Sequence, residues 1–228
     1  MKFRDKLAVA HRFGTVIAKA PFVRGVCLSG TMSKGVMYEK SDIDYFIITS
    51  PGRLWIAKLF LVFYRKFILR DNTENFCINY FIDTAHLSIE ERNQFTATEL
   101  ATTIPIFGFG QYEKLIHHNN WMKSICPNTV NRTKEFLIEK SGFRSKSILE
   151  RLLNHRITDW VNQWLMRQTQ KRNKKKFGHL YPAEELAIML KSKEYVSKGH
   201  LFNNQKILLT QLAKKEQQFE TSFNLSLS

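Results

Sequence analysis

The sequence predicts an α+β fold: a small mixed β-sheet with flanking helices in residues 1–108, followed by a helical domain in residues 109–228. Apolar runs of strand length at 23–28, 43–49 and 75–83 are separated by segments of helical period. A Pro/Gly break follows at 104–108, where we place the domain boundary. A hydrophobic content of 43% is ample for a packed core.

Three helices are expected in the first part, at residues 3–19, 53–70 and 94–103. The segment 53–70 is the most apolar window, but three cations interrupt it, Lys58, Arg65 and Lys66. A membrane span needs about 20 predominantly apolar residues. We therefore expect a core helix packed on the sheet and no membrane span.

The second part shows a helical pattern throughout. Helices are expected at 112–121, 130–140, 146–168, 183–190 and 205–219. The long helix carries an amphipathic stripe that includes Ile157, Trp160 and Trp164, and it is expected to join a bundle docked beside the sheet. The tail after Glu220 is expected to be disordered or loosely docked.

The charge balance is the strongest feature of the composition. The net charge is +15 with a pI near 9.8, and residues 132–228 hold 19 Lys and Arg against 9 Asp and Glu. Such a balance implies affinity for nucleic acid or another polyanion through the basic C-terminal half. The segment 170–179 has five cations in six positions, which leaves two interpretations: contact with a polyanion or nucleoside triphosphate, or a solvated loop.

Cysteine and histidine usage gives no metal or disulfide framework. Three cysteines, Cys27, Cys77 and Cys126, lack zinc spacing, and the histidines have no ligand spacing with Cys or acids. No signal-peptide pattern follows Met1. We expect a cytoplasmic protein.

The most informative stretch is Val26 to Ile48, in which an apolar run, a small-residue turn and an acid pair follow one another. Alternate residues of a strand share a face, so Asp42 and Asp44 are expected to point together, away from the core. Two adjacent carboxylates suit a divalent cation, and Mg²⁺ is commonly held by carboxylates together with substrate phosphates. Gly30 and Thr31 offer backbone N–H groups and a hydroxyl to a phosphate. Both groups reach one site only if the first two strands run antiparallel.

This pattern resembles the signature of the DNA polymerase β-like nucleotidyltransferase superfamily. Gly30-Thr31 follows an apolar strand, ten residues intervene, and Asp42-Ile43-Asp44 lies between apolar residues. Thr31 replaces the usual Ser and keeps the hydroxyl. The match covers about residues 22–50, and the topology extends it loosely to about residue 110.

The resemblance implies transfer of a nucleoside monophosphate from a nucleoside triphosphate to an acceptor hydroxyl, with Mg²⁺ or Mn²⁺ as cofactor. Asp42 and Asp44 would be catalytic and hold the metal, and Gly30 and Thr31 would hold the β- and γ-phosphates. Three further residues are candidates for the nucleotide-binding set, Ser33, Lys34 and Asn79.

The third carboxylate that this superfamily usually carries on the next strand has two candidate positions. If residues 53–70 form a crossover helix, strand 75–83 runs parallel to strand 43–49, and Asn79, which cannot act as a base, lies near the acid pair. If the strand runs antiparallel, Asp83 completes a catalytic triad. Glu99 is a spare acid that can approach the site. Because of Asn79, the alternative function is a catalytically weak or inactive nucleotide-binding, RNA-binding or regulatory protein with this fold.

Overall fold

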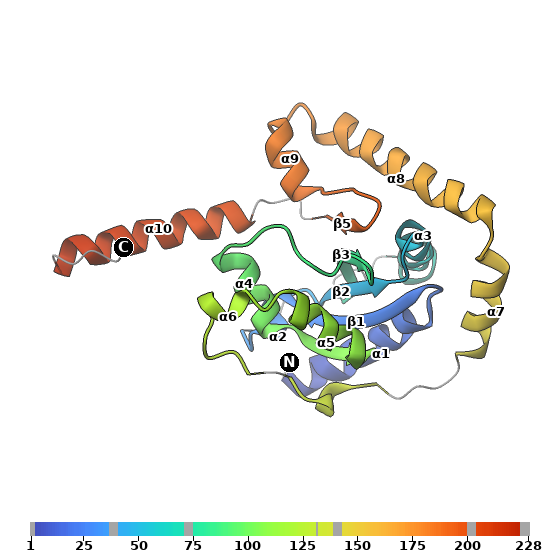
Figure 1. The fold of residues 1–228 in the computed structure, drawn as a ribbon, viewed down its shortest axis with the longest axis horizontal. Coiled ribbons are helices and arrows are strands. Elements are labelled where there is room, and N and C mark those ends of the chain that lie inside the picture. Colours follow the sequence, from blue (N-terminus) through green and yellow to red (C-terminus); the bar gives the residue numbers. More distant parts are fainter. Residues whose placement is uncertain are drawn as a thin grey trace.

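A five-stranded mixed sheet lies at the centre of the computed structural model, which describes residues 3–36, 41–70, 75–130, 132–138, 143–199 and 204–223 (Figure 1). The strands are β1 (Val23–Ser29), β2 (Asp44–Thr49), β3 (Cys77–Asp83), β4 (Ile104–Phe107) and β5 (Val196–Lys198). Their order is β4-β1-β2-β3-β5. β1 is antiparallel to β2 and β4, β2 is parallel to β3, and β3 is antiparallel to β5. The antiparallel first pair and the parallel crossover to the third strand are both confirmed.

Helices cover both faces of this sheet. In the first half they are α1 (Phe3–Lys19), α2 (Gly30–Ser33), α3 (Leu54–Tyr64) with a π-helical extension (Arg65–Leu69), and α4 (Gln94–Thr102). In the second half they are α5 (Phe109–His118), α6 (Met122–Ile125), α7 (Arg144–Leu153), α8 (Arg156–Phe177), α9 (Ala183–Met189) and α10 (Asn204–Phe223). α7 and α8 pass around the sheet, and α10 extends away from the body (Figure 1).

The alternation along β2 divides the core in two. Tyr45 and Ile47 pack with α1 and α3, whereas Phe46 and Ile48 pack with α4, α5 and α6 on the opposite face. Because the side-chain period of a strand is two, Asp44 belongs to the face of Phe46 and looks toward α4.

Two segments expected to lie outside the sheet are part of it. Residues 104–107 form the edge strand β4 and not merely a break, and an edge position accommodates Pro105 because no ladder N–H is needed there. β5 comes from the second part of the chain, so the expectation of a purely helical second part is wrong. The domain boundary near residue 108 stays a prediction.

Two expected helices take a different form. In the expected helix 130–140, only Lys134–Phe136 forms a 3₁₀ turn, and the Ile138 N–H donates to the Ile106 carbonyl oxygen; residues 131, 139 and 140 lie outside the described ranges. The expected helix 146–168 is divided at Asn154 into α7 and α8. His155 caps α8 by accepting a hydrogen bond from the Ile157 N–H.

The long helix also extends further than expected. The basic segment 170–179 is helical through Phe177 and is not a loop between helices. The stripe expected to face a bundle points largely to solvent, because Ile157, Trp160 and Trp164 are exposed. The helix α10 continues to Phe223, beyond the expected tail boundary, and residues 224–228 lie outside the described ranges. In the part of the chain that the structure describes, no helix is long and apolar enough to cross a membrane.

Candidate functional site

A cleft of about 700 Å³ opens on the α4 face of the sheet, where β1 ends and β2 and β3 begin. It gathers most of the polar residues expected at a functional site: Gly30, Thr31, Lys34, Asp42, Asp44, Asn79 and Glu99. These residues come from four separate segments of the chain. The antiparallel pairing of β1 with β2, in which Ser29 lies opposite Asp44, brings the turn and the acid pair together.

Gly30 is in direct contact with the second acid. Its φ of +70° lies in the left-handed region, and a Cβ placed on it would be 2.2 Å from Asp44 Oδ2. Both the backbone conformation and the close approach therefore require glycine. The turn and the carboxylate form one packed unit.

The two acids of the pair differ in their surroundings. Asp42 is exposed and Asp44 is partly buried, while Ile43 between them is fully buried. The pKa of Asp44 is raised to about 6, chiefly by burial; the charges of Asp42 and Glu99 also raise it, and hydrogen bonds with Cys77 and Asn79 lower it. A cation between the two carboxylates would relieve this repulsion.

The donor set fits Mg²⁺ held by two carboxylates. Within the described ranges, no group of three or more His, Cys, Asp and Glu side chains is placed to hold a metal ion. Asp42 and Asp44 are hard oxygen ligands, and Mg²⁺ typically takes one or two carboxylates and completes its shell with phosphate oxygens and water. The site thus suits Mg²⁺ that takes its remaining ligands from outside the protein.

Asn79 occupies the position beside the acid pair. Its Nδ2 donates a hydrogen bond to Asp44 Oδ1 over 3.2 Å. Between the pairs Asp44–Cys77 and Phe46–Tyr80, β3 has one residue more than β2, which is a β-bulge. Both Asn79 and Tyr80 consequently face the cleft.

Asp83 is far from this site, and the alternative in which it completes the triad is incorrect. It lies opposite Thr49 at the other end of β3, about 16 Å along the parallel ladder from the Asp44 level. The bulge also reverses the expected parity: Phe81 belongs to the α3 side and Ile82 to the α4 side, so Asp83 leaves the face of Asn79. Its Oδ1 instead accepts a hydrogen bond from the Ala85 N–H and contacts His86 Nδ1. The Asp83 carboxylate thus caps the turn that follows β3.

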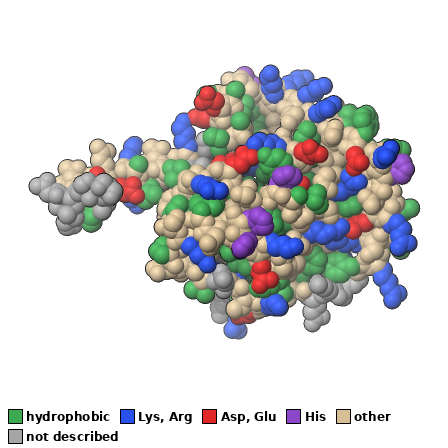
Figure 2. Space-filling view, viewed as in Figure 1, with side chains coloured by type: hydrophobic (Ala, Val, Ile, Leu, Met, Phe, Trp, Pro, Cys, Tyr) green, Lys and Arg blue, Asp and Glu red, His purple; other side chains and the backbone are tan. Residues whose placement is uncertain are grey.

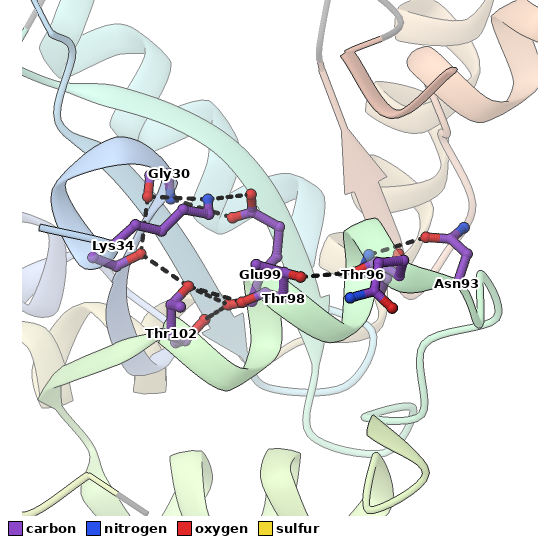
Figure 3. Close-up of polar contacts among 10 residues, drawn as sticks. Gly30, Lys34, Asn93, Thr96, Thr98, Glu99 and Thr102 are labelled. Atoms are coloured by element: carbon purple, nitrogen blue, oxygen red, sulfur yellow. Dashed lines mark hydrogen bonds and ion pairs between the residues drawn. The ribbon is translucent and has the colours of Figure 1, made fainter. Parts of the chain in front are cut away.

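Glu99 reaches into the position expected for a phosphate (Figure 3). Its Oε2 accepts a hydrogen bond from the Gly30 N–H over 3.3 Å, and its Oε1 forms an ion pair with Lys34 Nζ. Lys34 also donates to the Gly30 carbonyl oxygen. The backbone donor and the cation expected to bind phosphate are thus both held by one carboxylate of α4.

Ser33 does not face the cleft. It is buried, and its hydroxyl donates to the Gly30 carbonyl oxygen over 3.0 Å. It supports the turn from beneath and is not placed to contact a nucleotide, which corrects its assignment to the binding set.

Several residues that line the cleft were not identified from the sequence pattern. Cys77 lies opposite Asp44 on β3, and Lys198 of β5 lies opposite Tyr80. Burial lowers the pKa of Lys198. Helices α9 and α10 add apolar side chains, including Ile188 and Leu208. The strand alternation that places Cys77 on the same face as Asn79 is a sequence signal that could have identified Cys77. The other residues reach the cleft only through long-range packing, which the sequence does not show.

Comparisons of the chain with protein-family models, with curated proteins and with solved structures found no match.

Proposed function

We propose that the protein transfers a nucleoside monophosphate from a Mg²⁺-bound nucleoside triphosphate to an acceptor hydroxyl. The observation that carries this proposal is the convergence of Asp42, Asp44 and the Gly30 turn at one end of the cleft. The raised pKa of Asp44 adds support, because carboxylates left in mutual repulsion are suited to a cation. The resemblance of residues 22–50 to nucleotidyltransferases points to the same chemistry.

Each residue has a distinct role in this proposal. Asp42 and Asp44 would hold Mg²⁺, which when bound neutralises the phosphates and can lower the pKa of the attacking hydroxyl. The Gly30 N–H, the Thr31 hydroxyl and Lys34 would bind the β- and γ-phosphates. The acceptor oxygen then bonds to the α-phosphorus, the bond from that phosphorus to the bridging oxygen breaks, and pyrophosphate leaves.

Glu99 must release Lys34 and the Gly30 N–H before a phosphate takes its place, since both partners are engaged with its carboxylate. Two anions cannot share the same donors without strong repulsion. Once displaced, Glu99 is a carboxylate near the site that can accept the proton of the acceptor hydroxyl, a role that the amide of Asn79 cannot perform.

Asn79 also favours a second candidate function, nucleotide binding without efficient transfer. With an amide hydrogen-bonded to Asp44 where a third acid would serve, the described residues offer only two carboxylates for a metal. One metal–triphosphate complex can bind such a site, but a second metal at the attacking oxygen would lack a ligand. Transfer should then be slow.

A transfer assay separates these functions. The protein is incubated with Mg²⁺ and ATP, GTP, CTP or UTP labelled at the α-phosphorus, in the presence of small hydroxyl compounds, protein or RNA. Nucleotidyl transfer moves the α-label to an acceptor, whereas a matched γ-label leaves with pyrophosphate. Binding by calorimetry without α-label transfer to any acceptor supports the second function. An acceptor that receives the γ-label contradicts both, because that result is phosphoryl transfer.

A further inference from the structure

The outward side of α8 carries a continuous stripe of aromatic and basic residues, which lies outside the cleft. We call it the α8 stripe: Arg156, Ile157, Trp160, Trp164, Arg167, Lys171, Lys174 and Lys175. Steps of three and four residues keep a side chain on one face of a helix of 3.6 residues per turn. All eight side chains are exposed.

The opposite side of α8 is the side that packs. Asn162 is buried there, and its Oδ1 accepts hydrogen bonds from the backbone N–H groups of Trp55 and Ile56 at the start of α3. Leu165 packs against the core on the same side. The helix is therefore anchored in one orientation, and the α8 stripe is held facing solvent.

The first half of the α8 stripe exposes large apolar groups. Trp160 is 66% exposed, Trp164 46% and Ile157 67%. Ile148 and Leu152 of the preceding helix α7 are exposed as well. Contiguous exposed apolar surface of this kind marks an interaction site in a folded protein. Figure 2 shows hydrophobic side chains gathered over this part of the molecule, beside a group of Lys and Arg over the end of α8.

The second half of the α8 stripe is uniformly positive. Arg167, Lys171, Lys174 and Lys175 follow the two tryptophans on the same face, and among the described residues none of these four cations forms an ion pair. The acid of α8 is Asp159, which pairs with Arg53. An anionic partner would meet these cations without displacing an existing carboxylate.

We propose that the α8 stripe binds single-stranded nucleic acid. The indoles of Trp160 and Trp164 lie one helical turn apart, about 6 Å along the axis, which allows neighbouring bases to stack on them. The cations from Arg167 to Lys175 continue along the same line for about 12 Å and would follow the phosphates of two or three further nucleotides. Stacking platforms next to a positive track are the means by which proteins bind single strands without sequence preference.

The order of residues along the α8 stripe favours a strand over a lipid surface. A helix in a membrane interface turns an apolar face toward the acyl chains and keeps its cations on the other face. Here Arg167 and Lys171 lie in line with the tryptophans, so burying the indoles in lipid would also direct these cations into it. A flexible polyanion running along the helix contacts both groups.

Fluorescence anisotropy of a fluorescein-labelled 20-nucleotide oligo(U), with the full chain at 50 and 200 mM salt, tests this inference. Trp160→Ala with Trp164→Ala should weaken binding at least tenfold, and Trp160→Phe with Trp164→Phe should restore most of the affinity because a ring remains. Changing Lys171, Lys174 and Lys175 to Gln should weaken binding and reduce the salt slope by about 2. The matched control, Lys214→Gln with Lys215→Gln on the exposed face of α10, should change affinity less than twofold.

Three outcomes would overturn the inference. The first is no oligonucleotide binding by the wild-type chain at 50 mM salt, and the second is equal affinities of the wild type and the double Trp→Ala variant. The third is an equal loss of affinity in the α10 control and in the α8 variant that lacks the three lysines. A parallel arm uses vesicles of phosphatidylcholine with 30% phosphatidylglycerol. Vesicle binding that is lost in the Trp→Ala variant, without oligonucleotide binding, would assign the α8 stripe to a membrane surface instead. The inference is independent of the proposed function, because the α8 stripe contributes no residue to the cleft.

Discussion

Replacing Asp44 by Asn should stabilise the ligand-free protein while removing its capacity to bind a metal–nucleotide complex. The substitution keeps the size of the side chain and an acceptor oxygen for Asn79, but it removes a partly buried negative charge beside Asp42 and Glu99. Gain of stability together with loss of binding is the behaviour of a functional group kept at a cost to the fold.

The magnitude follows from the pKa. Burial raises the pKa of Asp44 from 3.8 to about 6, so the native state retains a proton that the unfolded chain releases. The free energy of unfolding of the wild type therefore falls as pH rises from about 4 to 6 and is constant above that range. Two pKa units correspond to roughly 3 kcal/mol, an upper limit that partial exposure reduces to about 1–2 kcal/mol.

Urea unfolding followed by circular dichroism at pH 8 and at pH 4 measures this effect. The free energy of unfolding of Asp44→Asn should exceed that of the wild type by about 1–2 kcal/mol at pH 8 and by little at pH 4, where the wild-type carboxyl is protonated in the native state. Asp42→Asn, at an exposed position, is the matched control and should give a smaller gain. An Asp44→Asn protein that is no more stable than the wild type at pH 8, or equally stabilised at both pH values, would show that the charge of Asp44 does not destabilise the native state.

Four further substitutions test the local geometry. Asn79→Asp should strengthen Mg²⁺ binding or raise turnover, whereas Asp83→Asn should leave turnover unchanged. Titration calorimetry measures Mg²⁺ binding by the two variants, and the α-label assay measures their turnover. Loss of activity only in Asp83→Asn would contradict the assignment of Asn79, and not Asp83, to the site. Gly30→Ala should abolish nucleotide binding and lower the melting temperature, because its Cβ would lie 2.2 Å from Asp44 Oδ2; an unchanged melting temperature would disprove the close contact. Lys146→Met should lower the free energy of unfolding by about 1–3 kcal/mol in urea titrations, because Lys146 donates hydrogen bonds to the backbone carbonyls of Ala18 in α1 and Val23 in β1. A loss below about 0.5 kcal/mol would argue against these hydrogen bonds.

The local pattern of the N-terminal half was sufficient to predict most of its fold. The alternation around Ile43 and Tyr45 placed Asp42 and Asp44 on one face, and the requirement for a shared site correctly predicted the antiparallel pairing of the first two strands. The length of the apolar segment 53–70 allowed a crossover, and the parallel pairing that follows places Asn79 beside Asp44.

Features that depend on tertiary contacts were not predictable. The bulge in β3 changes which side Asp83 faces, and nothing in its strand sequence indicates that extra residue. β5 is three residues long and acquires its strand conformation by pairing with β3. The apolar period of α8 correctly indicated a helix, but periodicity cannot distinguish a face that packs from one left open to solvent, as Trp160 demonstrates.

The contact between Glu99 and Lys34 in the cleft was likewise not predictable from the sequence. The two residues are 65 positions apart, and only the packing of α4 against the end of β1 brings the carboxylate to the Gly30 N–H. The sequence showed an acid that can approach the site, but it did not show that this acid contacts the Gly30 N–H and Lys34, the groups expected to bind a phosphate.

Isothermal titration calorimetry of ATP, GTP, CTP and UTP tests the central claim most directly, with wild-type protein and the Asp42→Ala, Asp44→Ala double variant, each with Mg²⁺ and with a chelator. The wild type should bind at least one triphosphate in a Mg²⁺-dependent manner, and the double variant should bind none. Absence of binding to the wild type, or equal affinities for the wild type and the double variant, would contradict it.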